Sequence, residues 1–148
     1  MLRRIGRLLT IGAGALVTLA LVAIVSVYGL SESRLRATYP TDIAVPAIPS
    51  DAASIERGRL LASAGTHCTG CHGANLGGHT VIDVPPILLV APNLTSGAGG
   101  IATRYSDADW ARAIGHGVRP DGTPLQIMPS QNFQQLSDAD LGAIIAYV

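Results

Sequence analysis

The chain has 148 residues, with ten arginines, no lysine and ten acidic residues, so its formal net charge is zero when the histidines are neutral. Residues 1–50 contain five arginines against two acids and residues 51–148 contain five arginines against eight acids, so the C-terminal part is mildly acidic. Neither part has a basic stripe with interleaved aromatic residues, and the composition therefore gives no support to nucleic-acid binding.

An apolar segment begins the chain. Residues 8–30 are 23 consecutive uncharged residues, and Arg3, Arg4 and Arg7 precede them. At about 1.5 Å of rise per residue, a helix of that length crosses the roughly 30 Å hydrocarbon core of a bilayer. A cleaved signal peptide also begins with positive charge, but its apolar region is usually only about 7–15 residues long. We therefore expect residues 1–30 to be a transmembrane anchor or an uncleaved signal, with a cleaved signal as the alternative.

The arginines around this segment predict its orientation. Three precede it and two, Arg34 and Arg36, follow it, which favours an N-terminus in the cytoplasm. Everything after Leu30 is then exported, whether or not the segment is cleaved.

A proline-containing stretch follows the apolar segment. Residues 31–50 include Pro40, Pro46 and Pro49 and few large apolar residues, which predicts an extended, semi-rigid linker. The folded domain is then predicted to cover residues 51–148.

The first half of that domain contains one predicted helix and one long loop. Good helix formers with apolar residues on one side predict a helix over residues 52–64, which leads into the two cysteines. Residues 73–104 are rich in glycine and proline and show no sustained period of two or 3.6, so we expect an ordered loop without strands. A connection of that length is uncommon in a compact domain unless it wraps a ligand or serves function.

Two later segments begin with helix-capping signals. Ser106 and Ser137 are placed as N-caps, each with acidic residues in the first turn and an apolar residue before the cap. The first helix is expected to run to about Ile114 and to stop at Gly115 or Gly117. The second is expected to continue to the last residue, and its end without a C-cap suggests a chain that is truncated in that helix.

Both cysteines of the chain belong to one short motif. Cys68 and Cys71 are three residues apart, and His72 follows directly. Cysteines at this spacing lie on one side of a helical turn, and the histidine can point from the end of that turn toward the same ligand. Cys-x-x-Cys-His is the attachment signature of c-type haem, in which both sulfurs form thioethers with the porphyrin and the histidine ligates iron. A buried porphyrin also supplies an apolar core to a domain that has one Trp and one Phe.

Three other fates of the cysteines are open. A zinc site needs four ligands, whereas the remaining histidines, His67, His79 and His116, stand at irregular spacing. A redox dithiol is expected within a βαβ pattern, and strands are hard to find here. A disulfide between residues three apart closes so small a loop that it adds little stability. Haem attachment is the interpretation these observations favour, and His67 is then expected to be exposed and outside the site.

The sixth iron ligand has to come from outside the motif. Met128 is the only methionine after the first residue, and it precedes Pro129 in a segment with no helix or strand period. A lone methionine is usually a flexible core filler, but a thioether is the common partner of histidine in electron-transfer haem. We predict Met128 as the distal ligand opposite His72, with His79 and His116 as the competing candidates.

The chain resembles class I mono-haem c-type cytochromes, and it is most similar to the haem modules of membrane-bound periplasmic cytochrome subunits that serve alcohol, aldehyde or sugar dehydrogenases. The resemblance covers residues 54–148. It rests on the cysteine motif, on "APNLT" at residues 91–95, on "YSDADWARAIGHGVRPDG" and on "MPSQNFQQLSDADLGAIIAYV". It implies an all-α, cytochrome c-like helical domain around one covalently bound haem c, preceded by one N-terminal transmembrane helix.

The resemblance also implies roles for particular residues. It assigns the thioether bonds to Cys68 and Cys71. The two iron ligands are His72, the proximal one, and Met128, the distal one. Asn93 and Leu94 are assigned to the loop at the haem edge. The first helix is implied to cross the last one through Gly58 and Leu61, near Ile144 and Tyr147. Such dehydrogenase subunits usually carry three haem motifs, whereas this chain has one, and its last helix is shorter than the family pattern.

The function implied is that of a one-electron carrier, not an enzyme, between a dehydrogenase and the respiratory chain at the periplasmic face of a bacterial inner membrane. Expected partners are a membrane or periplasmic dehydrogenase, an oxidase or a quinol-linked complex. The acidic balance and the absence of lysine argue against a lysine-ringed docking face. A peroxidase-like or gas-binding haem protein is the alternative if Met128 is not a stable ligand.

Overall fold

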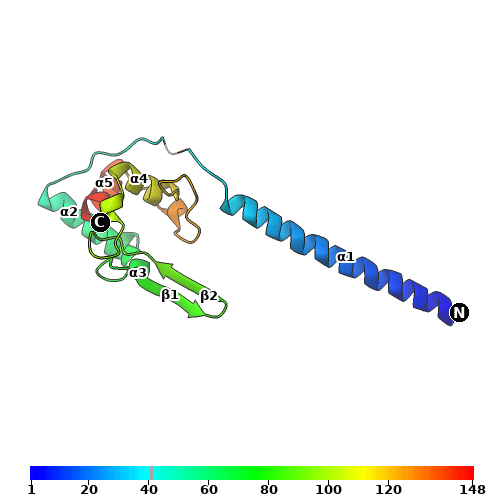
Figure 1. The fold of residues 1–148 in the computed structure, drawn as a ribbon. Helices are drawn as coiled ribbons and strands as arrows, with labels where there is room; N and C mark the ends of the chain where they lie inside the picture. The colour runs from blue at the N-terminus through cyan, green and yellow to red at the C-terminus, as the bar shows by residue number, and fades with distance from the viewer. Residues whose placement is uncertain (41) are drawn as a thin grey trace. The chain divides into compact units, whose positions relative to one another are not determined.

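The computed structural model describes residues 1–40 and 42–148. They form two compact units, Met1–Ala37 and Thr38–Val148 (Figure 1). The predicted linker includes residue 41, which lies outside the described residues.

The first unit consists of helix α1, Leu2–Leu35, none of whose residues is buried. It is long and apolar enough to cross a membrane, a property that it shares with signal sequences. The helix contains the predicted segment 8–30 and continues into the stretch expected to be linker. An ion pair between Glu32 and Arg36, one helical turn apart, supports this extension, with Nε and Oε1 separated by 2.5 Å.

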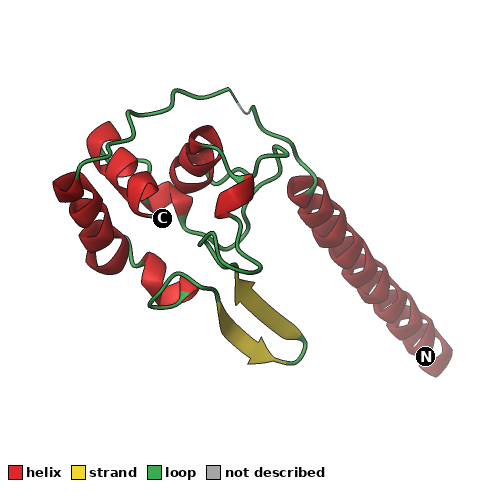
Figure 2. Ribbon diagram, turned by 60° about the vertical axis from the view of Figure 1, so that its left-hand side comes forward, coloured by secondary structure: helices red, strands yellow, loops and turns green. Residues whose placement is uncertain are grey.

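The regular structure of the second unit is mainly helical, as the sequence predicts, with one small sheet (Figure 2). Its helices and strands are α2 (Ala52–Leu60), α3 (Cys68–His72), β1 (His79–Val84), β2 (Ile87–Ala91), α4 (Asp107–His116) and α5 (Asp138–Tyr147). A π-helical turn covers Leu61–Gly65, and 3-10 turns cover Ala102–Arg104 and Ser130–Asn132. The helix predicted over 52–64 is confirmed as α2 with the π-helical turn that continues it.

Strands β1 and β2 form an antiparallel hairpin where we expected an irregular loop. The prediction of a strand-free loop over 73–104 was therefore wrong for residues 79–91. Most of the strand residues are branched and apolar, which suits a pleated surface, but a bulge between Thr80 and Ile82 shifts the register. The bulge and the exposure of β1 along its whole length remove the alternation by which a half-buried strand is recognised.

Helices α2 and α5 approach closely at Gly58. A Cβ atom at this buried glycine would overlap the carbonyl group of Ala143 and would lie 3.1 Å from the backbone nitrogen of Ile144. Leu61 and Tyr147 pack against the core cluster of the same unit. The predicted crossing of the first helix of the domain with the last one is thus confirmed, at Ala143 and Ile144.

We expect Gly58→Ala to destabilise the folded domain by roughly 1–3 kcal/mol, the usual cost of overpacking a well-packed core. Backbone atoms of α5 fill the space, so the two helices must separate to admit a methyl group. Denaturant unfolding of the haem-loaded chain, followed by circular dichroism, measures the loss. Gly115→Ala is the matched control, because its Cβ would meet only Leu141 Cδ2, at 3.7 Å. Equal effects of the two substitutions would contradict the close crossing.

The core of the second unit is built from helices and loops together. Its buried cluster consists of Leu76, Leu94, Trp110, Ala111, Ile114, Phe133, Ile144 and Ile145. Tyr105 packs on Trp110, with ring centroids 4.9 Å apart. Leu76, Leu94 and Phe133 lie outside the helices and strands, so their burial fixes the irregular segments that carry them.

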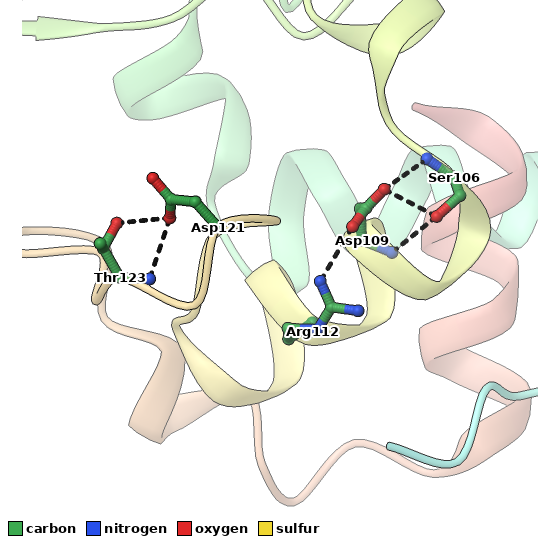
Figure 3. A network of polar contacts seen from close by, with 5 residues as sticks. All are labelled: Ser106, Asp109, Arg112, Asp121 and Thr123. Atoms are coloured by element: carbon green, nitrogen blue, oxygen red, sulfur yellow. Dashed lines mark hydrogen bonds and ion pairs between the residues drawn. The ribbon is translucent and has the colours of Figure 1, made fainter. Parts of the chain in front are cut away.

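The predicted helix starts are both confirmed. Ser106 and Asp109 form a capping box at α4, in which each side chain accepts a hydrogen bond from the backbone N–H of the other (Figure 3). The Ser137 side chain caps α5 by accepting from the backbone N–H of Asp140. Helix α4 ends at Gly117, whose φ of 68° is a left-handed conformation that glycine adopts readily.

Polar contacts fix α4 and the turn that follows it (Figure 3). The buried Arg112 donates from Nη1 to Asp109 Oδ1 at 2.9 Å. Burial disfavours the Asp109 carboxylate, but hydrogen bonds from Ser106 and Arg112 outweigh it and lower its pKa. Beyond the helix, Asp121 Oδ1 accepts from both the backbone N–H and the hydroxyl of Thr123. These bonds shape the chain on its way to Met128.

An ion pair between Arg57 and Asp140 joins α2 to α5, with Nε and Oδ1 separated by 2.5 Å. The hydrogen bond from Arg57 is the largest cause that lowers the pKa of Asp140 below its ordinary value of 3.8. Because that pKa is lower in the folded chain than in the unfolded one, the carboxylate adds stability above pH 3.8. The contribution is lost as the pH falls through the folded-state pKa.

We therefore expect Asp140→Asn to be less stable than the parent at about pH 6, with the difference shrinking as the pH falls below the ordinary carboxyl pKa. Thermal unfolding of the haem-loaded chain across this pH range measures it. Asp138→Asn removes the same charge from the same helical turn and is the control. A difference between Asp140→Asn and the parent that stayed constant with pH would contradict the pairing.

Part of the predicted linker belongs to the second unit, which begins at Thr38. Ile43 and Ile48 pack against its core cluster. The carbonyl of Ala47 occupies the space that a Cβ at Gly142 would need. The two isoleucines are thus partly buried, whereas Val45 between them is exposed, and this stretch contributes to the packing of the domain.

Candidate cofactor site

Helix α3 contains the Cys68–His72 motif in a single short helical segment. His67 precedes it with φ 56° and Gly73 follows it with φ 83°. A glycine adopts such a conformation without steric cost, so the helix ends directly after the histidine. The two cysteines therefore share one side of a turn, as their spacing predicts.

The His72 ring is held by a backbone carbonyl. Its Nδ1 lies 2.9 Å from the carbonyl oxygen of Pro92. A carbonyl only accepts, so Nδ1 carries the proton and donates it, which leaves the lone pair of Nε2 free to bind a metal. Such a hydrogen bond on the outer nitrogen is the usual way in which a ligating histidine is oriented.

Both ends of the hairpin are bonded to residues around the motif. Before β1, the backbone N–H of Gly78 donates to the carbonyl of His72 at 2.8 Å. After β2 comes Pro92, whose carbonyl accepts from the His72 ring. Leu94 N–H then donates to the carbonyl of Leu76 at 2.8 Å. The position of the histidine is therefore coupled to the base of the hairpin.

The two cysteines are free thiols in different environments. Cys68 is half-buried against the core cluster, and its Sγ lies 3.1 Å from Thr66 Oγ1. Burial raises the pKa of the Cys68 thiol, against the smaller opposing effect of the Thr66 hydrogen bond. Redox-active dithiols instead need a lowered pKa, so this environment does not favour the dithiol alternative. Cys71 is exposed.

Met128 lies in an irregular segment that is fixed by its neighbours. The side chain is half-buried and packs against the core cluster. Ser130, which is buried, donates from its hydroxyl to the carbonyl of Ala113 in α4 at 3.0 Å and from its backbone N–H to the carbonyl of Met128 at 2.9 Å. The methionine is thus tied to α4 although it belongs to no helix or strand.

A cavity of about 440 Å³ separates the cysteine segment from the methionine segment. One wall is formed by residues that precede Cys68 in the sequence, and the other by residues that follow Met128. The lining residues are Leu61, Gly65, Thr66, His67, Pro129, Asn132, Phe133 and Leu136. Most of this lining is apolar. Two free thiols on one turn and a histidine with Nε2 available fit a covalently attached group, and the cavity is lined by residues that flank this motif and Met128 in the sequence.

The other predicted residues occupy different positions. Asn93 is held within its own loop, where Oδ1 accepts from the backbone N–H and hydroxyl of Thr95. Leu94 is buried in the core cluster. His79 is exposed at the start of β1, and His116 is exposed at the end of α4. His116 lines a second cavity, of about 300 Å³, together with Met128.

The zinc alternative finds no site among the described residues, because nowhere in residues 1–40 and 42–148 do three or more His, Cys, Asp or Glu side chains form a group that could hold a metal. His67 is exposed, as predicted, and lines the larger cavity. Sequence reasoning missed two groups of the site: the Pro92 carbonyl and the Ser130 hydroxyl. A backbone carbonyl leaves no signal in a sequence, and serine is too common in loops to stand out.

Comparison with known proteins connects this geometry to a family. The family model for cytochrome c matches residues 55–148. The chain is 32% identical over 138 residues to a subunit of nicotinate dehydrogenase from Pseudomonas putida, an alignment that covers 85% of the chain and 12% of that protein.

Two further relatives are cytochrome subunits. The chain is 30% identical over 103 residues to the cytochrome c subunit of alcohol dehydrogenase (quinone) from Gluconacetobacter polyoxogenes, covering 66% of the chain and 22% of the relative. It is 32% identical over 101 residues to the fructose dehydrogenase cytochrome subunit of Gluconobacter japonicus, covering 64% of the chain and 21% of the relative. The chain thus spans less than a quarter of the length of each of these relatives.

Proposed function

The chain belongs to the cytochrome c family, and from that premise we propose that it carries electrons between a dehydrogenase and the respiratory chain at the periplasmic face of a bacterial inner membrane. Membership implies one covalently bound haem c and an electron-transfer role, not catalysis of a substrate reaction. When bound, the haem supplies an iron that cycles between the ferrous and ferric states.

We assign the haem-binding roles to four residues. Cys68 and Cys71 form the thioether bonds, His72 provides the proximal ligand through Nε2, and Met128 provides the distal sulfur. The observation that carries this assignment is the hydrogen bond from His72 Nδ1 to Pro92 O, because it orients the ring and presents Nε2 as the free nitrogen. Asn93 and Leu94 are assigned to the loop beside the haem edge.

With both His72 and Met128 bound to the iron, no position would be left open for oxygen or peroxide, which favours electron transfer over ligand chemistry. A thioether ligand also raises the reduction potential. The polypeptide contributes a largely apolar cavity lined by residues that flank the motif and Met128 in the sequence. We expect these features to give a reversible one-electron carrier.

The membrane arrangement is the second part of the proposal. Residues 1–30 anchor the chain in a single pass, residues 31–50 link the anchor to the domain, and residues 51–148 form the haem domain. The apolarity of α1 and the arginines before it support this arrangement. The relatives named above are dehydrogenase subunits, which supports a dehydrogenase as electron donor, with an oxidase or quinol-linked complex as the other partner.

Redox titration of the full chain in detergent tests the carrier proposal. One haem per chain should survive acid–acetone extraction and titrate reversibly as a single one-electron centre. Membranes that contain the chain should reduce this haem on addition of the donor's substrate, for which nicotinate, an alcohol and fructose are the first candidates. Extractable haem, or a haem that does not titrate reversibly, would contradict the proposal.

A further inference from the structure

The hairpin of β1 and β2, residues 79–91, gathers most of the exposed apolar surface of its unit. Six of the ten large apolar side chains that are exposed among the described residues of Thr38–Val148 belong to it. They are Val81, Ile82, Val84, Ile87, Leu88 and Val90, with Leu88 66% exposed. Apolar side chains gathered in this way on a protein surface mark an interaction site.

The hairpin is nearly uncharged and has open edges. Asp83 is its only formally charged side chain. The sheet has two strands, so among the described residues each strand has one outer edge without a strand partner. Such an edge presents backbone N–H and C=O groups that a strand of another protein can pair with.

The open edges and the near absence of charge together argue that the hairpin does not bind a lipid bilayer. Unpaired backbone groups find no hydrogen-bond partner in hydrocarbon, so an open-edged hairpin is costly to bury in a bilayer. The hairpin also lacks the lysines, arginines and aromatic residues with which interfacial segments hold a membrane surface. The surface of another protein suits the hairpin better, because it offers apolar contacts for the side chains and hydrogen-bond partners for the open backbone edges.

The size of the surface argues against a second copy of the chain. The six side chains expose on the order of 500 Å², below the roughly 800 Å² per partner of a standard stable interface. An area of this size matches the weak interfaces of transient electron-transfer complexes.

The hairpin also has a direct structural connection to the haem ligand. Gly78, before β1, and Pro92, after β2, are both hydrogen-bonded to His72. A protein that binds the hairpin is therefore joined through its base to the residue assigned as the proximal ligand.

We propose that the hairpin is the docking element for a redox partner protein, which contacts its nearly uncharged apolar surface and a free strand edge. This proposal rests on the carrier function proposed above. The partner exchanges one electron with the haem, and no bond is made or broken in the hairpin.

The double variant Ile87→Thr/Leu88→Thr tests the proposal in the haem-loaded full chain. Threonine keeps the branched shape that strands favour but removes apolar surface. Leu88→Thr alone is a second, milder variant. Leu60→Gln is the matched control, since it removes a similarly exposed apolar side chain from α2, outside the hairpin.

The measurement is reoxidation of the chemically reduced haem by air, in native membranes and in protein-free phosphatidylcholine vesicles. We expect the double variant to slow reoxidation in native membranes by about tenfold, the effect of losing an apolar contact at the centre of a small interface. Ferricyanide should oxidise the double variant directly at the rate of the parent chain. Leu60→Gln should be reoxidised in native membranes at the rate of the parent chain.

Three results would overturn the docking proposal. The first is a double variant that is reoxidised in native membranes at the parent rate. The second is protection of the hairpin amides from hydrogen exchange in protein-free vesicles, which would identify lipid as the occupant. The third is a dimer of the purified chain that the double variant dissociates. A parent chain reoxidised no faster in native membranes than in vesicles would instead contradict the carrier function itself.

Discussion

Met128→Ala is expected to leave the haem covalently attached while lowering its reduction potential and opening the iron to added ligands. Attachment depends on Cys68 and Cys71, which the substitution does not touch. Loss of the thioether removes the ligand that raises the potential. Axial ligands set haem potentials over roughly 0.8 V, so we expect a fall on the order of 100 mV. Potentiometric titration and binding of imidazole or cyanide measure the two effects.

His116→Ala is the matched control for this prediction, because His116 lines the same cavity as Met128. It should leave both the potential and the ligand reactivity near those of the parent. If Met128→Ala had unchanged ligand reactivity, and His116→Ala or His79→Ala became reactive instead, that histidine would be the distal ligand. The cavity beside Met128 gives small ligands a place to enter once the sulfur is removed.

His72→Ala is expected to be far more damaging than Met128→Ala. It removes the proximal ligand next to the attachment sites and, with it, the hydrogen bond that ties α3 to Pro92 at the base of the hairpin. Loss of a partner that only orients a metal ligand typically costs roughly 10–100-fold in metal affinity or activity, so loss of the ligand itself should exceed this. The yield of haem-loaded chain, measured by haem stain against total protein, should fall accordingly.

His67→Asn is the control within the same stretch of sequence. His67 is exposed and stands one residue before the motif, and asparagine tolerates its left-handed φ of 56°. This variant should lower the yield of haem-loaded chain far less than His72→Ala does. An equal loss of haem in His67→Asn and His72→Ala would mean that the damage comes from disturbing the segment, and would contradict a specific role for His72.

The parts of the fold that follow from local chemistry were predictable from the sequence. The caps at Ser106 and Ser137 depend on residues three positions apart, and the stop at Gly117 depends on one left-handed glycine. The helical segment at Cys68–His72 likewise follows from short-range spacing. The close crossing at Gly58 was accessible through family resemblance, which supplied the partner helix.

The parts that depend on distant contacts were not predictable in the same way. The hairpin was missed because its bulge and its exposed faces hide the alternation that marks a strand. The carbonyl of Pro92 and the hydroxyl of Ser130 act on residues 20 and 17 positions away in the chain. The packing of Ile43 and Ile48 in the predicted linker also depends on tertiary contacts.

Near-infrared magnetic circular dichroism of the ferric, haem-loaded full chain tests the central claim most directly, because the position of the charge-transfer band identifies the pair of axial ligands. We predict a low-spin haem with the band of histidine and methionine ligation, which disappears in Met128→Ala. A band of two histidines, or a high-spin spectrum at neutral pH, would contradict it.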